Sequence, residues 1–157
     1  MPSESRISAE LATFLESGLS IVVGTRNENL EPDGAVAWAA RADEAGERLT
    51  LFLHHIAARE MLRNLESHPE IAINFDQPTS HRACQVKGRY VSSRRARPAE
   101  RETVLRQIEG FTKNLEAIGF PAAMTGSWIT WPCTAIELRV TQLFEQTPGP
   151  GTGGPLR

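Results

Sequence analysis

Residues 75–90 read Phe-Asp-Gln-Pro-Thr-Ser-His-Arg-Ala-Cys-Gln-Val-Lys-Gly-Arg-Tyr, which predicts the end of one strand, a polar loop and the start of the next strand. Side chains of a strand alternate between its two faces, so Cys84 and Val86 share an apolar face. Gln85 and Lys87 share the opposite face, which is polar and cationic. The stretch therefore predicts a strand with one face for a core and one face for solvent or a ligand.

The polar side of this stretch gains further hydrogen-bond donors from the loop before the strand. His81 and Arg82 lie in that loop. Together with Gln85 and Lys87 they supply donors that could converge on a phosphate or on an electron-rich ring. The same four side chains would serve equally well as a solvated sheet edge, because polar and charged residues are usually exposed. The residues alone leave both interpretations open.

The chain before this stretch alternates short apolar runs with turn residues, as is typical of antiparallel strands. Helical spacing predicts a helix over residues 5–17, with Ser8 as its cap and Gly18 as its end. A second helix over 57–68 is stopped by Pro69. The expected strands are 19–25, 35–42, 49–53 and 70–75, with turns at 27–34 and 43–46.

The chain after the stretch contains two more strands and one long helix. The strand over 84–92 contains Gly88, which indicates a bulge or a close approach of another backbone segment. A helix is expected to begin at Pro98 and to end at Gly119. Alternating apolar residues predict a last strand over 133–144.

This order of elements predicts a mainly β protein. Six antiparallel strands in one domain are best protected by curling on themselves, so the expected fold is a six-stranded antiparallel split β-barrel with flanking short helices. Residues 1–147 are expected to form this single domain. Residues 148–157 are expected to be a flexible tail, because their Pro/Gly-rich run cannot form a regular element.

The composition is that of an ordinary globular domain. The 157 residues are 40% hydrophobic and 23% charged, and the formal net charge of −2 gives no general attraction to nucleic acid or to anionic membranes. Apolar runs stay far below membrane-spanning length, and the first ten residues do not resemble a secretory leader, so a cytoplasmic location is expected. Cys84 and Cys133 are expected to be core residues, and no metal site is expected.

Three local patterns carry a resemblance to a known family: residues 51–75, the segment Gln85-Val-Lys-Gly-Arg, and Thr79-Ser-His-Arg with the closing Glu145-Gln-Thr-Pro-Gly-Pro-Gly. Over residues 11–147 the chain resembles the FMN-binding split-barrel flavoproteins related to pyridoxamine 5′-phosphate oxidase, in a less-characterised branch. The resemblance implies a homodimer with each FMN in a cleft between the two barrels. It also implies that basic residues of the strands and of the short helix hold the phosphate.

The chain departs from the oxidase at two places. Family members often have Ser-Arg-Lys at the start of the short helix, where this chain has Arg59-Glu60-Met61. The second strand of the oxidase has an arginine and a lysine that contact FMN and substrate, where this chain supplies only Arg41. The resemblance is therefore not to the oxidase itself.

The residues assigned to cofactor binding are His55, Arg59, His81, Arg82, Gln85, Lys87 and Trp38. Several of them also have structural interpretations: His55 as a structural histidine, Arg59 as a solvated surface residue, and Trp38 as a filler of the barrel. Trp128 and Trp131 would close a cleft or lie in the dimer interface. No catalytic residue is assigned.

These observations favour an FMN-binding oxidoreductase that acts on a small molecule. The alternative is a non-catalytic protein of the same fold that binds a flavin, haem or a deazaflavin. A basic run also suggests nucleic-acid binding, but Glu100 and Glu102 dilute it and Tyr90 is its only interleaved aromatic side chain, which favours a solvated surface instead. The run comprises Lys87, Arg89, Arg94, Arg95, Arg97 and Arg101.

Overall fold

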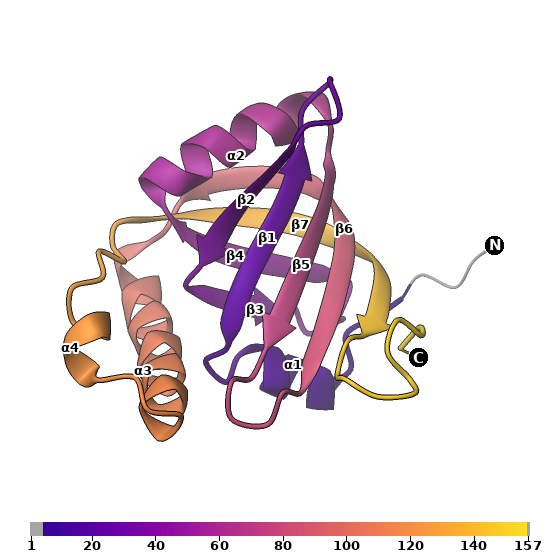
Figure 1. Ribbon diagram of the computed structural model, residues 1–157. Coiled ribbons are helices and arrows are strands. Elements are labelled where there is room, and N and C mark those ends of the chain that lie inside the picture. Colours follow the sequence, from indigo (N-terminus) through magenta and orange to yellow (C-terminus); the bar gives the residue numbers. More distant parts are fainter. Residues whose placement is uncertain (1–4, 157) are drawn as a thin grey trace.

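The computed structural model describes residues 5–156, which form one curled antiparallel sheet with helices at its ends and on one side (Figure 1). The strands are β1 (Ser20–Arg26), β2 (Pro32–Ala37), β3 (Ala39–Ala42), β4 (Arg48–His54), β5 (Glu70–Asp76), β6 (Ala83–Arg95) and β7 (Cys133–Glu145). Their order across the sheet is β2-β1-β5-β6-β7-β4-β3. The split-barrel architecture is confirmed, but the sheet has seven strands and not the six that were predicted.

The additional strand arises because the segment predicted as one strand over 35–42 is broken at Trp38. β2 pairs with β1 at one edge of the sheet, whereas β3 pairs with β4 at the opposite edge. The chain therefore crosses from one edge to the other at Trp38, whose N–H donates to the Phe52 carbonyl oxygen. β2 also begins earlier than predicted, so the turn expected over 27–34 is confined to the residues before Pro32.

The helices follow the predicted order. They are α1 (Ala9–Leu15), α2 (His55–Ser67), the 3₁₀ turn η1 (Pro98–Glu100), α3 (Arg101–Ala117) and α4 (Ala122–Thr125). Ser8 caps α1 as predicted, because its Oγ accepts the Leu11 N–H. α4 lies in a segment without a clear sequence pattern and was not predicted. In the part of the chain that the structure describes, no helix is long and apolar enough to cross a membrane.

The main core fills the inside of the curled sheet. Residues of α1 and α2 pack against the inward side chains of the strands, with Leu15, Met61 and Ile73 fully buried. Both cysteines are buried, as predicted, and burial raises the pKa of each thiol to about 12.

β6 and β7 are long strands that link the two halves of the sheet. Their pairing shifts register at Gly88 and again after Tyr90. A Cβ on Gly88 would overlap the carbonyl oxygen of Arg139 and the Leu138 side chain, so only glycine fits there. The predicted bulge at Gly88 is confirmed.

The Pro/Gly-rich segment after β7 turns back along that strand. The Glu145 N–H donates to the Gly154 carbonyl oxygen at 2.8 Å, and the Leu156 N–H donates to the Leu143 carbonyl oxygen at 2.9 Å. The Leu156 side chain packs against the main core. The last described residues therefore close the same end of the sheet as α1 (Figure 1).

The outer surface of the sheet differs between its two halves. Outside β3, β4 and the end of β6, η1 and α3 cover a second buried cluster that contains Phe52, Val104 and Ala135. Outside β2, β1, β5 and the start of β6, the described chain places no helix over the sheet, and this side faces the viewer in Figure 1. Val22 and Val36 are each about half exposed there. We call the first surface the covered half and the second the bare face.

Candidate functional site

Two rows of outward side chains cross the bare face and the adjoining part of β7, according to the strand registers. Each row contains one residue from each of the five neighbouring strands β2, β1, β5, β6 and β7. One row is Val36, Val22, Asn74, Gln85 and Phe144; the next is Gly34, Gly24, Ala72, Lys87 and Gln142. The residues of the second row on β2, β1 and β5 are two glycines and an alanine, so their small side chains leave a shallow floor beside Lys87.

This floor forms part of a groove with a volume of about 560 Å³. Gly24 and Ala72 are at its bottom and carry almost no side chain. The remaining lining residues are Thr25, Arg26, Glu70, Ile71, Lys87, Gly88, Arg89, Thr141 and Gln142. Ligand sites are commonly concave surfaces of this size with a few polar groups at the rim.

The groove has an excess of positive charge, because three cationic side chains and one carboxylate line it. Glu70 lies between two arginines, 3.0 Å from Arg26 and 3.9 Å from Arg89. The Lys87 ammonium lies 5.2 Å from the centre of the Phe144 ring and has no carboxylate partner within residues 5–156. An anion or an electron-rich ring is therefore the favoured occupant of the groove.

Gln85 lies beside Lys87 on the same side of β6, separated by one inward residue. Its strand neighbours are Asn74 on β5 and Phe144 on β7. The side-chain amide is half-buried, and none of the described residues is its hydrogen-bond partner. Gln85 therefore offers both a donor and an acceptor to a ligand that lies on the bare face.

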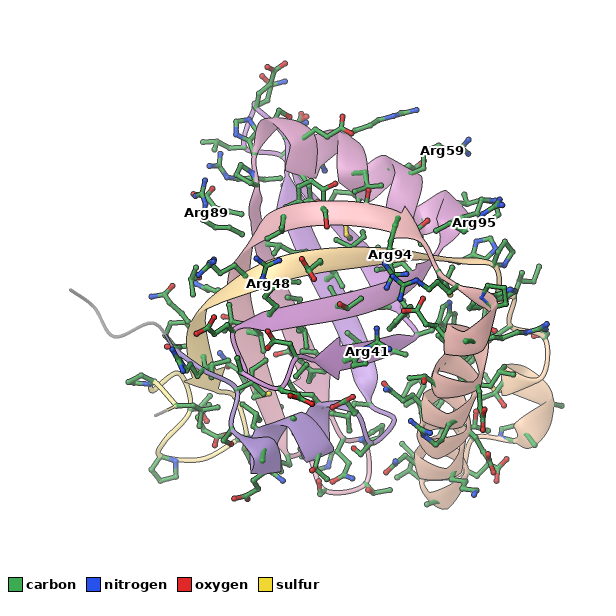
Figure 2. The ribbon with its side chains drawn as sticks, turned by 180° about the vertical axis from the view of Figure 1, so that it is seen from behind. Arg41, Arg48, Arg59, Arg89, Arg94 and Arg95 are labelled. Carbon is green, nitrogen blue, oxygen red and sulfur yellow. The ribbon has the colours of Figure 1, made fainter. Side chains whose placement is uncertain are left out.

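A second hollow, of about 390 Å³, lies along α2. His55, Arg59 and Arg63 line it and follow one another at spacings of four residues on one side of the helix. Neither arginine has an ion-pair partner in the described part of the chain, and the Arg59 side chain projects away from the sheet (Figure 2). Thr134, which also lines the hollow, pairs with Arg95 at the end of β6. Glu66 is the one carboxylate in the lining, and the two arginines outnumber it, so the hollow is suited to a phosphate group.

The predicted donors His81 and Arg82 lie at the end of the sheet near α1. His81 has a left-handed backbone conformation with φ 60°, which turns the loop before β6 begins. The Arg82 guanidinium carbon lies 4.1 Å from the centre of the Phe14 ring of α1. The cluster expected from the sequence is thus divided, with Arg82 at the barrel end and with Gln85 and Lys87 on the bare face.

Trp38 packs against other aromatic and apolar side chains of the covered half. Its ring centre lies 5.1 Å from that of Trp128, which in turn stacks on Phe111 at 5.8 Å. Trp131 packs against the same buried cluster. Trp38 therefore packs on the outer, helix-covered side of the sheet and does not fill the barrel interior, which was its structural interpretation from the sequence.

The sequence-predicted residues therefore fall in four places, and the α2 hollow and the groove on the bare face share no lining residue. Sequence reasoning missed Arg26, Gln142 and Arg63. Alternation along β6 already placed Arg89 beside Lys87, but Arg26 and Gln142 reach the groove only through the order of strands in the sheet. The i, i+4 spacing of Arg63 from Arg59 was a usable signal.

Neither the family models nor the curated proteins compared with the sequence contain a match. Solved structures of similar fold are found. An F420 reductase is 17% identical with a TM-score of 0.54, covering 83% of this chain and 93% of that chain. An FMN-binding protein from Syntrophomonas wolfei is 10% identical with a TM-score of 0.53, covering 85% and 81%. A Clostridium acetobutylicum protein related to general stress protein 26, of the pyridoxinephosphate oxidase family, is 14% identical with a TM-score of 0.52, covering 88% and 87%.

This chain is a split barrel of the kind found in those proteins. The resemblance drawn from residues 51–75 and from the strand after the polar loop is confirmed at the level of the fold. The low identities place no individual residue of the chain in a cofactor site. The roles of the site residues are argued from their own geometry below.

Proposed function

We propose that the protein is an FMN-binding oxidoreductase that acts on a small molecule, with each flavin held between two copies of the chain. The observation that carries the proposal is the pair Gln85 and Lys87 at a cationic groove on an uncovered sheet face, where neither side chain has a hydrogen-bond or carboxylate partner among residues 5–156. The split-barrel fold supports it, because a solved structure of the same fold is an FMN-binding protein.

The donors of the chain fit the two ends of FMN. The α2 hollow, with Arg59 and Arg63, suits the phosphate, since guanidinium groups offer a fixed fork of donors to its oxygens. The Gln85 amide suits the polar edge of the flavin ring, and the Lys87 ammonium suits negative charge on that ring. Because the two places share no lining residue, the proposed flavin uses the hollow of one copy and the bare face of the other.

The bare face is also the proposed surface of contact between copies. Val22 and Val36 expose apolar side chains next to the flat floor formed by Gly24 and Ala72. A contiguous apolar patch with a polar rim is typical of a protein interface. Two-fold pairing would cover this patch on both copies at once and would exclude water from Gln85 and Lys87.

When bound, the isoalloxazine ring would supply the hydride transfer. The protein contributes position and charge: Gln85 orients the ring edge, Lys87 stabilises negative charge, and the covered interface excludes water. Glu70, the one carboxylate of the groove, is bound to two arginines and so is poorly placed to move a proton. The chemistry proposed therefore depends on the cofactor and on electrostatics.

One observation favours a second candidate, a deazaflavin-binding protein. A solved structure similar in fold to this chain is an F420 reductase. The groove and its cations would serve an anionic deazaflavin as well as FMN. Parallel titration with F420 and FMN separates the two candidates, because the tighter ligand identifies the cofactor.

The proposal is tested by the absorption spectrum of the purified protein and by quenching of FMN fluorescence at micromolar concentration. We expect a flavin spectrum or saturable quenching, and about tenfold weaker binding for Lys87→Ala, the loss of one charge-assisted contact. Lys113→Ala is the matched control, because Lys113 lies on α3 with an exposed partner, Glu109. A colourless protein without quenching would contradict the proposal, and flavin binding without turnover by a nicotinamide donor would indicate a non-catalytic binder.

A further inference from the structure

A cleft of about 200 Å³ lies at the end of the barrel, on the inner side of β6 and β7 and away from the bare face. We call it the end cleft. α1 forms one wall and the returning C-terminal segment forms another, so segments from opposite ends of the chain meet there (Figure 1). Its lining residues are Arg6, Ser8, Glu10, Leu11, Phe14, Arg82, Ala83, Cys84, Leu143, Glu145 and Leu156.

The body of the end cleft is apolar. Leu11 and Phe14 of α1 face Leu143 of β7 and Leu156 of the returning segment. Cys84 is also apolar in effect, because burial raises the pKa of its thiol to about 12 and keeps it neutral. A dry cavity of about 150 Å³ accommodates benzene, so the end cleft has room for an apolar group of that size or slightly larger.

One cation of the cleft is fixed in place but lacks a hydrogen-bonding partner. The Arg82 guanidinium stacks 4.1 Å from the centre of the Phe14 ring. The backbone of Arg82 is held by the loop, since its N–H donates to Ser80 Oγ and its carbonyl oxygen accepts the Gln77 N–H. Within residues 5–156 the guanidinium donates to no side chain or carbonyl, so its fork is available to a carboxylate.

Two carboxylates line the same cleft. Glu145 accepts the Thr147 N–H at 2.8 Å, and this hydrogen bonding lowers the pKa of the Glu145 carboxyl and keeps it ionised. Glu10 lies in the first turn of α1. Arg6 does not neutralise them, because it pairs with Glu47 at 2.7 Å. The positive charge of Arg82 contributes to the lowered pKa of Glu145, so these two side chains lie close together. A ligand with both a carboxylate and an ammonium group would bridge them, whereas a ligand with one charge would pair with one side chain and face the like charge of the other.

We propose that the end cleft binds a small apolar α-amino acid. Its carboxylate pairs with the Arg82 guanidinium, its ammonium group faces Glu10 and Glu145, and its side chain packs between α1 and the returning C-terminal segment. The proposal rests on this cleft alone and is independent of flavin binding. It assigns to the protein a small-molecule site that is separate from the groove on the bare face.

The test is calorimetric titration of the full chain with L-phenylalanine, and with two probes that each lack one charge, hydrocinnamate and phenethylamine. We expect saturable binding of phenylalanine and at least tenfold weaker binding of each probe, because each leaves one charged group of the cleft unpaired. Absence of saturation by L-phenylalanine and by L-leucine would overturn the proposal. Equal binding of hydrocinnamate would overturn it as well, since the two carboxylates would then make no contribution.

Variants separate the two charged contacts. Arg82→Gln is expected to weaken phenylalanine binding at least tenfold, while Arg106→Gln, at an exposed arginine of α3 outside the end cleft, leaves it unchanged. Glu10→Gln provides a second readout that does not depend on loss of binding, because removing this charge should tighten hydrocinnamate binding. Unchanged phenylalanine binding by Arg82→Gln, or unchanged hydrocinnamate binding by Glu10→Gln, would contradict the assignment.

Discussion

The covered half and the bare face belong to the same sheet, but their polar side chains differ in hydrogen bonding. In the covered half, Gln107 is 2% exposed and its amide bonds both the N–H and the carbonyl oxygen of Ala40. On the bare face, Gln85 and Lys87 have no such partners among the described residues. The chain completes one half with its own helix, and the proposed function completes the other half with a cofactor and a second copy.

The covered half offers the largest predicted effect. Gln107→Leu removes the hydrogen bonds to Ala40 and leaves two buried backbone groups unpaired, which should lower the free energy of unfolding by about 3 kcal/mol. Urea unfolding followed by tryptophan fluorescence measures it. The same change at Gln142, which is exposed beside the groove, should alter stability by less than about 0.5 kcal/mol. Equal losses of stability for Gln107→Leu and Gln142→Leu would show that the two halves do not differ in the hydrogen bonding of their polar side chains.

Glu100 is the second test of the covered half. It is 5% exposed, and its carboxylate accepts hydrogen bonds from Arg94 and Arg41 (Figure 2), which tie β6 and β3 to η1. Glu100→Gln should cost about 2 kcal/mol at neutral pH, the loss of a charged hydrogen-bond acceptor.

The loss of stability caused by Glu100→Gln should depend on pH in a defined direction. Hydrogen bonds from Arg94 lower the pKa of the Glu100 carboxyl from 4.5 to about 2. A group whose folded pKa is lowered contributes stability above its unfolded pKa and loses it as the pH falls toward the folded value. The difference between the wild type and Glu100→Gln should be constant above pH 5 and should shrink from about pH 4.5 to about pH 2. A difference that grows toward low pH would contradict the assignment of the ion pairs.

The proposed interface predicts a smaller effect on association. Val22→Glu places a charge in the middle of the bare face and should weaken self-association about tenfold, roughly 1.4 kcal/mol. Leu105→Glu is the control, because Leu105 is similarly exposed, at 47% against 50% for Val22, but lies on α3. Sedimentation equilibrium measures both variants. Identical masses at every concentration would exclude the bare face as the contact.

The smallest expected effect concerns the floor of the groove. A Cβ on Gly24 would come no closer than 3.8 Å to the Ala72 carbonyl oxygen, so Gly24→Ala should fold normally and gain about 0.5 kcal/mol of stability. The methyl group would narrow the floor and weaken FMN binding by about threefold, or roughly 0.7 kcal/mol. Gly34→Ala has the same clearance but lies outside the groove lining, so it should leave FMN binding unchanged.

The sequence predicted much of the fold because each strand carries its own alternating pattern. It missed the break at Trp38, since small apolar residues on both sides of it look continuous, and only the pairing of β2 with β1 and of β3 with β4 separates them. Gln85 and Lys87 were placed together correctly because they share one strand face. Arg82 was misgrouped with them, because the left-handed backbone at His81 redirects the loop toward α1.

The groove and the α2 hollow depended on contacts that no local pattern contains. Arg26 approaches Lys87 only because β1 lies beside β5, and β5 beside β6. Residues this far apart in the sequence become neighbours through strand order. The sequence therefore indicated which types of donor are present but not which residues line a cavity together.

The shared flavin site is tested most directly by mixing two variants, Arg59→Ala from the α2 hollow and Gln85→Ala from the bare face. Each variant alone should bind FMN at least about tenfold more weakly than the wild type. After dissociation and reassembly of an equal mixture, about a quarter of the sites should regain wild-type affinity, because half of the dimers are hybrids with one intact site. If FMN binding in the mixture stays at the level of the separate variants, the site is not shared between copies and the proposed arrangement is wrong.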